Sequence, residues 1–224
     1  MSMDAGLVGH WKFNEKSGII ANDSSRYRNT GTLVGATHLP VWSEKGIKFD
    51  GVDDYVNTGN NASLNITSEI TIEAWVKTTQ TGEKAIVFKS FNDNVAPNYG
   101  NLYRLILNVN VAQVLIINSN RTLYQVKGNV PINDNNWHFV VGVFDSNINK
   151  LRLYVDGSQD GSDLTTTGII GTSTQPVSIG ANIAPGGSQV MLFNGSIDEV
   201  RIYNRALSAN EIKRHYDSTK HNYI

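Results

Sequence analysis

The chain has 224 residues, 40% hydrophobic and 17% charged, a length and apolar share that suit a single all-β domain with a packed core. Its 19 basic and 20 acidic residues give a net charge of -1, which argues against a protein whose main role is to hold nucleic acid. The absence of Cys excludes disulfide frameworks, zinc fingers, iron–sulfur clusters and thiol catalysis. No apolar run is long enough for a membrane-spanning helix.

Short segments of near-alternating polarity, separated by turn residues, predict a series of β-strands. In the first, LVGHWKF at 7–13, alternation is expected to place Leu7 and Trp11 on one face and Val8 and His10 on the other. Further strands are predicted at 69–78, 84–90, 103–108, 113–118, 122–127, 137–145, 150–157, 176–180 and 191–204. Regular short strands of this kind are typical of an all-β sandwich or barrel.

One helix is predicted near the C-terminus. Ser208 and Glu211 have the spacing of a capping box, and the following EIKRHYDS continues the helix. No linker or repeat divides the chain, so we expect one domain over 4–218. Residues 1–3 are expected to be an expression remnant and residues 219–224 a frayed tail.

The segment after the first strand is rich in short oxygen-bearing side chains. Asn22-Asp23-Ser24-Ser25 is followed by Asn29-Thr30-Gly31. Carboxylate, amide and carbonyl oxygens are the ligands that Ca²⁺ takes, but this loop has one carboxylate, and a second must come from elsewhere in the fold. The alternative interpretation is an Asx-rich turn that caps itself.

Two acidic residues are adjacent near the end of the chain, in FNGSIDEVRIYNRALSANEI. Asp198 and Glu199 on one strand point to opposite faces and cannot form a close catalytic pair. One of them is expected to need a partner such as a cation or Arg. The alternative is an ordinary salt bridge between Glu199 and Arg201.

Seven segments, taken in order, cover nearly the whole chain: GLVGHWKFNEKSG, NDSSRYRNTGTL, IKFDGVDDYV, ITIEAWVKT, NNWHFVVGVFD, LRLYVDG and FNGSIDEVRIYNRALSANEI. Together they resemble the laminin-G-like, concanavalin A-like jelly-roll family. The resemblance implies a two-sheet antiparallel jelly-roll sandwich of about fourteen strands with a short C-terminal helix. It also implies a structural Ca²⁺ held by Asp23 and Asp198, with Asn29 and Thr32 as further candidate ligands.

Enzymes exist on this architecture, but the sequence lacks a strand with alternating catalytic carboxylates. Glu73 stands alone in ITIEAWV. Hydrolysis of a glycosidic bond needs two carboxyl groups across it, so a hydrolase would have to pair Glu73 with Asp145 or Asp156 from another strand. We therefore expect no catalytic residues.

Carbohydrate recognition uses aromatic faces for the C–H surfaces of sugars and amides, carboxylates or Arg for their hydroxyls. The segment SFNDNVAPNYGNLYRLILN and a neighbouring strand offer this mixture. The candidate ligand-binding residues are Asn92, Asn94, Tyr99, Tyr103, Arg104 and Tyr124. The alternative is that the Tyr residues are half-buried sheet residues and the Asn residues only form turns.

The expected function is a non-catalytic carbohydrate-binding (lectin) or adhesion module with a structural calcium ion. We expect it in a larger secreted or surface protein, so that it is extracellular or on the cell surface. A glycan is the expected partner, with other protein domains as further candidates and no nucleic acid or membrane insertion. The alternatives are a protein-interaction or spacer module, a glycoside hydrolase or polysaccharide lyase, and a capsid use of the same fold.

Overall fold

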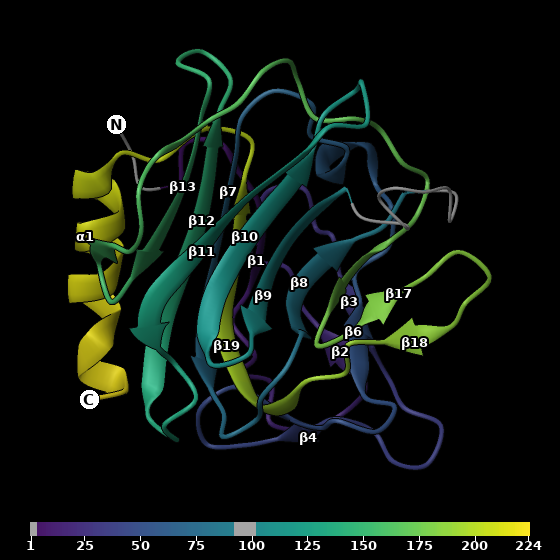
Figure 1. The fold of residues 1–224 in the computed structure, drawn as a ribbon. Helices are drawn as coiled ribbons and strands as arrows, with labels where there is room; N and C mark the ends of the chain where they lie inside the picture. Colours follow the sequence, from purple (N-terminus) through teal and green to yellow (C-terminus); the bar gives the residue numbers. More distant parts are fainter. Residues whose placement is uncertain (1–3, 92–101) are drawn as a thin grey trace.

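The computed structural model describes residues 4–91 and 102–224 and consists mainly of two large antiparallel sheets (Figure 1). Sheet A has the order β14 (Ser158–Gln159), β13 (Lys150–Val155), β12 (Trp137–Asp145), β7 (Ile70–Lys77), β19 (Asn194–Tyr203), β5 (Ile47–Asp50) and β4 (Val41–Trp42). β1 (Leu7–Trp11) pairs with β19, and β15 (Leu164–Thr165) pairs with β13. The first and last strands of the chain therefore lie side by side.

Sheet B packs against sheet A and contains the strands of the middle of the chain. Its order is β11 (Leu123–Pro131), β10 (Val111–Ile117), β9 (Tyr103–Asn108), β8 (Lys84–Lys89), β16 (Val177–Ile179), β6 (Tyr55–Asn57), β3 (Gly31–Val34) and β2 (Ile20–Ala21). A hairpin of β17 (Asn182–Ile183) and β18 (Gln189–Val190) stands apart, and one helical turn, η1, covers Ala62–Leu64. The architecture confirms the predicted all-β jelly-roll sandwich with a short C-terminal helix.

The core lies between the sheets, because alternate residues of each strand point inward. Phe49, Val76, Phe144 and Ile197 are among the fully or nearly fully buried side chains that fill it. Their neighbours along the strands point to the outer faces of the sandwich. The alternation therefore assigns each residue of sheet A either to the core or to the outer face.

The first strand does not alternate as predicted. A β-bulge between Leu7 and Gly9 shifts the register against β19, so Val8 and Trp11 enter the core while Leu7 lies on the outer face of sheet A. A bulge adds a residue on one strand and so reverses the faces before and after it. Gly9 allows this path, since a Cβ there would lie 2.5 Å from the Trp11 ring.

Helix α1 (Ala209–Thr219) has the predicted capping box, with Ser208 and Glu211 satisfying each other's backbone amides. It lies on the outer face of sheet A, at the left of Figure 1, over an apolar patch that includes Trp75 and Phe139. Among the described residues no helix is long and apolar enough to cross a bilayer.

The tail after the helix is ordered, contrary to the prediction that it frays. Residues Lys220–Asn222 form the helical turn η2, and the Tyr223 ring stacks on Trp75 with 4.1 Å between ring centroids. Trp75 also donates from its ring nitrogen to the hydroxyl of Thr219 at 3.0 Å. The tail thus covers the outer face of sheet A beyond the end of the helix.

Candidate functional site

Two of the expected calcium ligands, Asp23 and Asn29, belong to one hydrogen-bonded loop. The Asp23 carboxylate accepts bonds from the backbone amides of His10, Ser25 and Asn29 at 2.7–2.8 Å, and from the Ser25 hydroxyl at 2.7 Å. The Asn29 side chain donates to the Val8 carbonyl at 2.6 Å. The bond from the Ser25 amide closes an Asx-turn, which agrees with the alternative interpretation of this loop.

The other two expected ligands lie on separate strands. Thr32 is exposed on β3, and Asp198 is buried on the outer face of sheet A. The Asp198 carboxylate accepts from the Tyr223 hydroxyl at 2.7 Å and from the Glu199 amide at 2.9 Å. Both carboxylates thus accept hydrogen bonds within the protein, and the calcium site implied by the resemblance stays a prediction.

A different acidic group is found in the FDGVDDY turn. Asp50, Asp53 and Asp54 bring carboxylate oxygens within 4.8 Å of one another. Two of them brace the turn, since Asp54 accepts from the Asp50 amide at 2.9 Å and Asp50 accepts from the Val52 amide at 2.7 Å, whereas Asp53 accepts from the Thr37 amide at 2.9 Å. Burial and its acidic neighbours raise the pKa of Asp54 to about 6. One oxygen of Asp53 and one of Asp54 are buried without a hydrogen-bond partner among the described residues, so the turn accounts for only part of the cluster.

Among the predicted sugar-binding residues, Asn92, Asn94 and Tyr99 lie outside the described residues. Tyr103 is fully buried, and its hydroxyl donates to the Leu64 carbonyl at 3.0 Å, so it presents no face to a ligand and the prediction is corrected.

Arg104 and Tyr124 do not form one platform. They pair with adjacent residues of β10, Leu115 and Ile116, and adjacent strand residues face opposite sides of a sheet. Arg104 is buried over the Phe88 ring, and the Tyr124 hydroxyl is 2.7 Å from that of Thr167.

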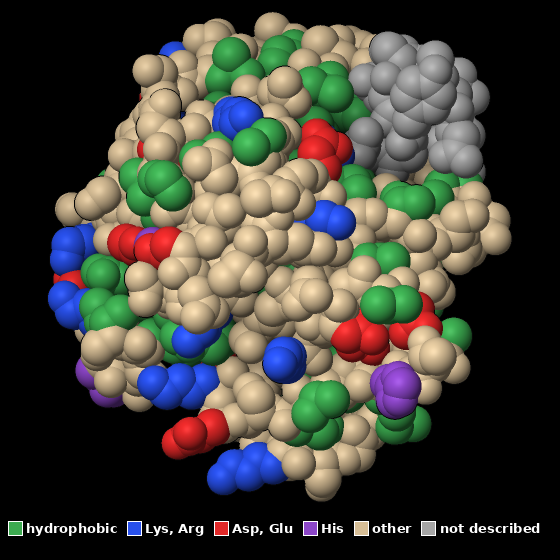
Figure 2. Space-filling view, turned by 60° about the horizontal axis from the view of Figure 1, so that its bottom comes forward, with side chains coloured by type: hydrophobic (Ala, Val, Ile, Leu, Met, Phe, Trp, Pro, Cys, Tyr) green, Lys and Arg blue, Asp and Glu red, His purple; other side chains and the backbone are tan. Residues whose placement is uncertain are grey.

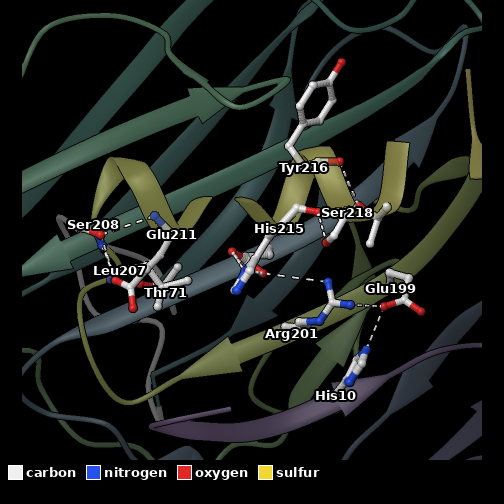
Figure 3. A network of polar contacts seen from close by, with 12 residues as sticks. His10, Thr71, Glu199, Arg201, Leu207, Ser208, Glu211, His215, Tyr216 and Ser218 are labelled. Atoms are coloured by element: carbon white, nitrogen blue, oxygen red, sulfur yellow. Dashed lines mark hydrogen bonds and ion pairs between the residues drawn. The ribbon is translucent and has the colours of Figure 1, made fainter. Parts of the chain in front are cut away.

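Glu73, the residue that a hydrolase would use, lies in a buried network with His215 and Arg201. Figure 3 labels His215, which comes from helix α1, and Arg201 and Glu199 of the same network. The His215 ring nitrogen is 2.9 Å from the Glu73 carboxylate, and Arg201 is 3.9 Å from it on the other side. Arg201 also pairs with Glu199, which confirms the predicted salt bridge, and Glu199 in turn binds His10 at 2.8 Å. Glu73 is fully buried and contacts the protein alone.

Neither proposed partner of Glu73 stands across a cleft from it. Asp145 lies four residues along β12 from the residue opposite Glu73, about 13 Å away, and glycosidases need their two carboxyl groups within about 10 Å. Asp156 holds the His138 ring at 2.8 Å and the Phe139 amide at 2.9 Å. The pairs considered for catalysis are therefore structural.

The end of sheet A that the helix and tail leave uncovered carries a row of polar and aromatic side chains. Register places Ser196 of β19 between Lys48 of β5 and Lys77 of β7, with Trp137 of β12 beyond Lys77. Cross-strand partners lie on the same face of a sheet, so the four side chains form one row on the outer face. Lys48 is exposed, and the other three are half-buried.

Two hollows, each of about 290 Å³, adjoin along this end of β19. We refer to them together as the groove. The first hollow is lined by Lys48, Lys77, Thr78, Thr79, Asn135, Asn194, Gly195 and Ser196. The second is lined by Lys12, Asn14, Glu44, Lys45, Asp198, Glu199, Asn222 and Tyr223. They meet because Ser196 and Asp198 project from the same face of β19, two residues apart.

Two aromatic rings lie beside the hollows. Tyr223 is in the second hollow, and its ring centroid is 5.0 Å from that of Trp137, which stands next to Lys77. The Lys45 ammonium lies 5.9 Å from the centre of the Tyr223 ring. The groove therefore combines aromatic surface, amides, hydroxyls and lysines, which is the mixture that sugar recognition requires.

The two hollows differ in charge, because the first has Lys48 and Lys77 without an acidic residue, whereas the second has two lysines and three acidic residues. Lys12, Lys48 and Lys77 make no ion pair with any residue in 4–91 or 102–224. Figure 2 brings the bottom of Figure 1 forward and shows separate basic side chains on this face, with acidic ones among them. Sequence analysis missed the groove, and the available signals were weak: three strand-end residues and one Trp, far apart in the chain.

A larger hollow, of about 470 Å³, lies beside β1 and is lined in part by Asp4, His10, Lys12 and Arg26. Burial lowers the pKa of His10, which is bound to Glu199. Among the described residues, no Trp, Tyr or Phe lines this hollow. It therefore offers less for a sugar than the groove does.

The sequence pattern of the concanavalin A-like lectin/glucanases superfamily matches residues 50–213. A search of curated proteins found no match.

Solved structures share the fold at low identity. The binding domain of Paraclostridial Mosquitocidal Protein 1 has a TM-score of 0.70 and 14% identity, covering 97% of this chain and 53% of that one. A structure of botulinum neurotoxin type C, whose cell entry depends on interaction with two ganglioside molecules, has a TM-score of 0.70 and 14% identity, and the match covers 96% of this chain and 51% of that one. The binding domain of botulinum neurotoxin DC in complex with rat synaptotagmin II has a TM-score of 0.69 and 14% identity, and the match covers 97% of this chain and 52% of that one. The chain spans about half the length of these structures.

Proposed function

This chain belongs to the concanavalin A-like lectin/glucanases superfamily, and from that premise we propose that it is a non-catalytic carbohydrate-binding module whose site is the groove at the open end of sheet A. The observation that carries the proposal is the cross-strand row of Lys48, Ser196, Lys77 and Trp137. The half-buried Trp137 ring provides an apolar face beside polar groups that are bound to no other side chain.

The groove is built on strands, which supports a largely preformed site. A sugar ring stacked on Trp137 has the Lys77 ammonium and the Asn135 amide close to its hydroxyls. Asn135 is held in place because its backbone amide donates to the Thr78 carbonyl at 3.0 Å. A single shallow site of this kind gives modest affinity, so display of several copies in a larger protein at the cell surface would strengthen binding.

The structural neighbours support a binding role as opposed to catalysis. Botulinum neurotoxin type C interacts with gangliosides, which carry glycans, and botulinum neurotoxin DC binds a protein, synaptotagmin II. The burial of Glu73 under helix α1 removes the carboxylate that the hydrolase alternative requires. Calcium has no part in the proposed binding step.

The test is isothermal titration calorimetry with a panel of soluble oligosaccharides, comparing the wild type with Trp137→Ala. We expect loss of the ring to weaken binding about tenfold. Tyr27→Ala removes an exposed aromatic from the N-terminal loop and serves as the matched control. Melting curves confirm that both variants are folded at the temperature of the titration.

Arg104→Ala and Tyr124→Ala test the competing location on sheet B. Binding that survives Trp137→Ala but is lost in either of these variants contradicts the proposed site. An absence of binding to every glycan in the panel contradicts the proposed function.

A further inference from the structure

The first hollow carries positive charge without any negative counterpart. Its eight lining residues include Lys48 and Lys77 and no acidic side chain. The two lysines lie on strands two apart, with Ser196 between them, so their Cα atoms are about 10 Å from each other. An anionic group placed over Ser196 would be within reach of both flexible side chains.

From this arrangement we infer that the groove selects glycans bearing carboxylate or sulfate groups, with Lys48 and Lys77 as the residues that determine this preference. The inference rests on the proposed function and names the class of ligand that the same site takes. The aromatic face of Trp137 can stack against any sugar, whereas the two ammonium groups strengthen the binding only of a sugar that carries negative charge.

The polar groups around the lysines are also available to an anion. The hydroxyls of Ser196 and Thr79 and the side-chain amide of Asn135 make no hydrogen bond within the described part of the chain. By contrast, the Asn194 amide donates to the Asp50 carbonyl at 2.8 Å, and the Thr78 hydroxyl donates to the Asn194 carbonyl. Ser196 thus offers a free hydroxyl between the two lysines, and Thr79 and Asn135 add free polar groups to the lining of the same hollow.

The strands beneath the hollow are closely packed, so the positions of the two lysines are fixed by the sheet. Gly195 has a φ of +146°, and a Cβ there would lie 2.3 Å from the Lys77 carbonyl oxygen. Only glycine permits the β19 backbone to approach β7 so closely. The spacing of Lys48 and Lys77 is therefore set by the sheet and not by contacts between their side chains.

The lysines are not needed to stabilise the fold. Lys48 is exposed and Lys77 half-buried, and neither ammonium has an ionic partner among the described residues. A single exposed lysine without an ionic partner is common on protein surfaces. Here two of them flank a hollow whose remaining lining is neutral and polar, and this combination favours an anionic ligand.

The experiment uses pairs of glycans in which one member carries an acidic group that the other lacks. Oligogalacturonate is compared with its methyl ester, sialyllactose with lactose, and heparin oligosaccharides with their desulfated forms. The first two pairs test a carboxylate and the third tests a sulfate. Each is titrated into the wild type, into the double variant Lys48→Met/Lys77→Met, and into Lys127→Met, which removes an exposed strand lysine from sheet B as a matched control.

We expect at least one glycan to bind about tenfold more tightly than the partner that lacks its acidic group. This advantage should be lost in the double variant. It should also be lost in 0.5 M salt, which screens exposed charges to within a few ångströms. Lys127→Met should bind as the wild type does. Equal binding of charged and neutral partners overturns the inference but leaves the proposed function standing. If the double variant still prefers the charged glycan, the proposed role of the two lysines is wrong. If no glycan binds at all, both the proposed function and the inference are wrong.

Discussion

Glu73 is a buried carboxylate under helix α1 that contacts the His215 ring and the Arg201 guanidinium. Its ion pairs with His215 and Arg201 explain why a charged side chain is fully enclosed in an otherwise apolar layer. Carboxylates in such a position hold a structure together and have no access to substrate. The acidic residue that sequence reasoning raised as a hydrolase candidate is therefore expected to act on stability.

Replacement of Glu73 by Ala should lower the free energy of unfolding by about 3–5 kcal/mol, because it removes the buried partner that His215 and Arg201 share. Urea unfolding measures the loss, with exposed Glu44→Ala as a control that should change stability by less than about 0.5 kcal/mol. Glycan affinity, measured where the variant is folded, should not change. A variant that keeps its stability but loses action on a glycan would restore the catalytic interpretation.

Asp198 gives the fold a pH dependence of definite sign. Burial raises its pKa from 3.8 to about 7, although its bond from Tyr223 acts in the opposite direction. Because the folded carboxyl holds its proton more tightly than the unfolded one, this residue lowers the free energy of unfolding as the pH rises from about 4 to 7. Below that window both states are protonated and the residue adds no slope.

The variant Asp198→Asn should remove this slope while keeping an oxygen that accepts from Tyr223. We expect it to be more stable than the wild type at pH 8, by on the order of 2 kcal/mol, and to approach the wild type near pH 4. Thermal unfolding of both proteins across this range is the measurement. A loss of stability at pH 8 would show that the ionised carboxylate is required, as a calcium ligand would be.

At the scale of elements, the C-terminal tail closes the outer face of sheet A. Tyr223 stacks on Trp75 and lies beside Trp137, so it separates the helix-covered part of the face from the groove. Tyr223→Ala should expose Trp75, shift tryptophan emission to longer wavelength and cost about 2 kcal/mol of stability. Ile224→Ala, which changes the neighbouring exposed residue, should do neither, and an unchanged spectrum for Tyr223→Ala would mean that the tail does not cover Trp75 in solution.

Local sequence signals predicted the helix and strands well. Features that depend on contacts between distant elements could not be predicted from them. The capping box of Ser208 and Glu211 located the helix because its interactions are within three residues of each other. The order of the tail depends on a ring contact between Tyr223 and Trp75, which are far apart in the chain, so no local signal predicts it. The bulge near Leu7 reversed the expected faces of β1 for the same reason, since it is defined by pairing with β19.

At the scale of the molecule, the groove exists only because sheet A has the order β12-β7-β19-β5. Alternating polarity and the family resemblance predicted two antiparallel sheets, and the structure confirms them. Neither predicts which strand ends are neighbours, so Lys48, Lys77, Trp137 and Ser196 could not be grouped from the sequence. The expected site on 92–124 drew on residues close in sequence, and two of these, Arg104 and Tyr124, face opposite sides of sheet B.

The most direct test of the proposed site is to map a bound glycan by amide chemical shifts. The ¹⁵N-labelled protein is titrated with the tightest-binding oligosaccharide of the panel, and the shifts of its backbone amides are followed. Our account predicts changes concentrated at 77–79, 135–137 and 194–196, the ends of three strands of sheet A. Changes confined to 103–108 and 123–127 on sheet B would contradict it and return the site to the strands on which the sequence first suggested it.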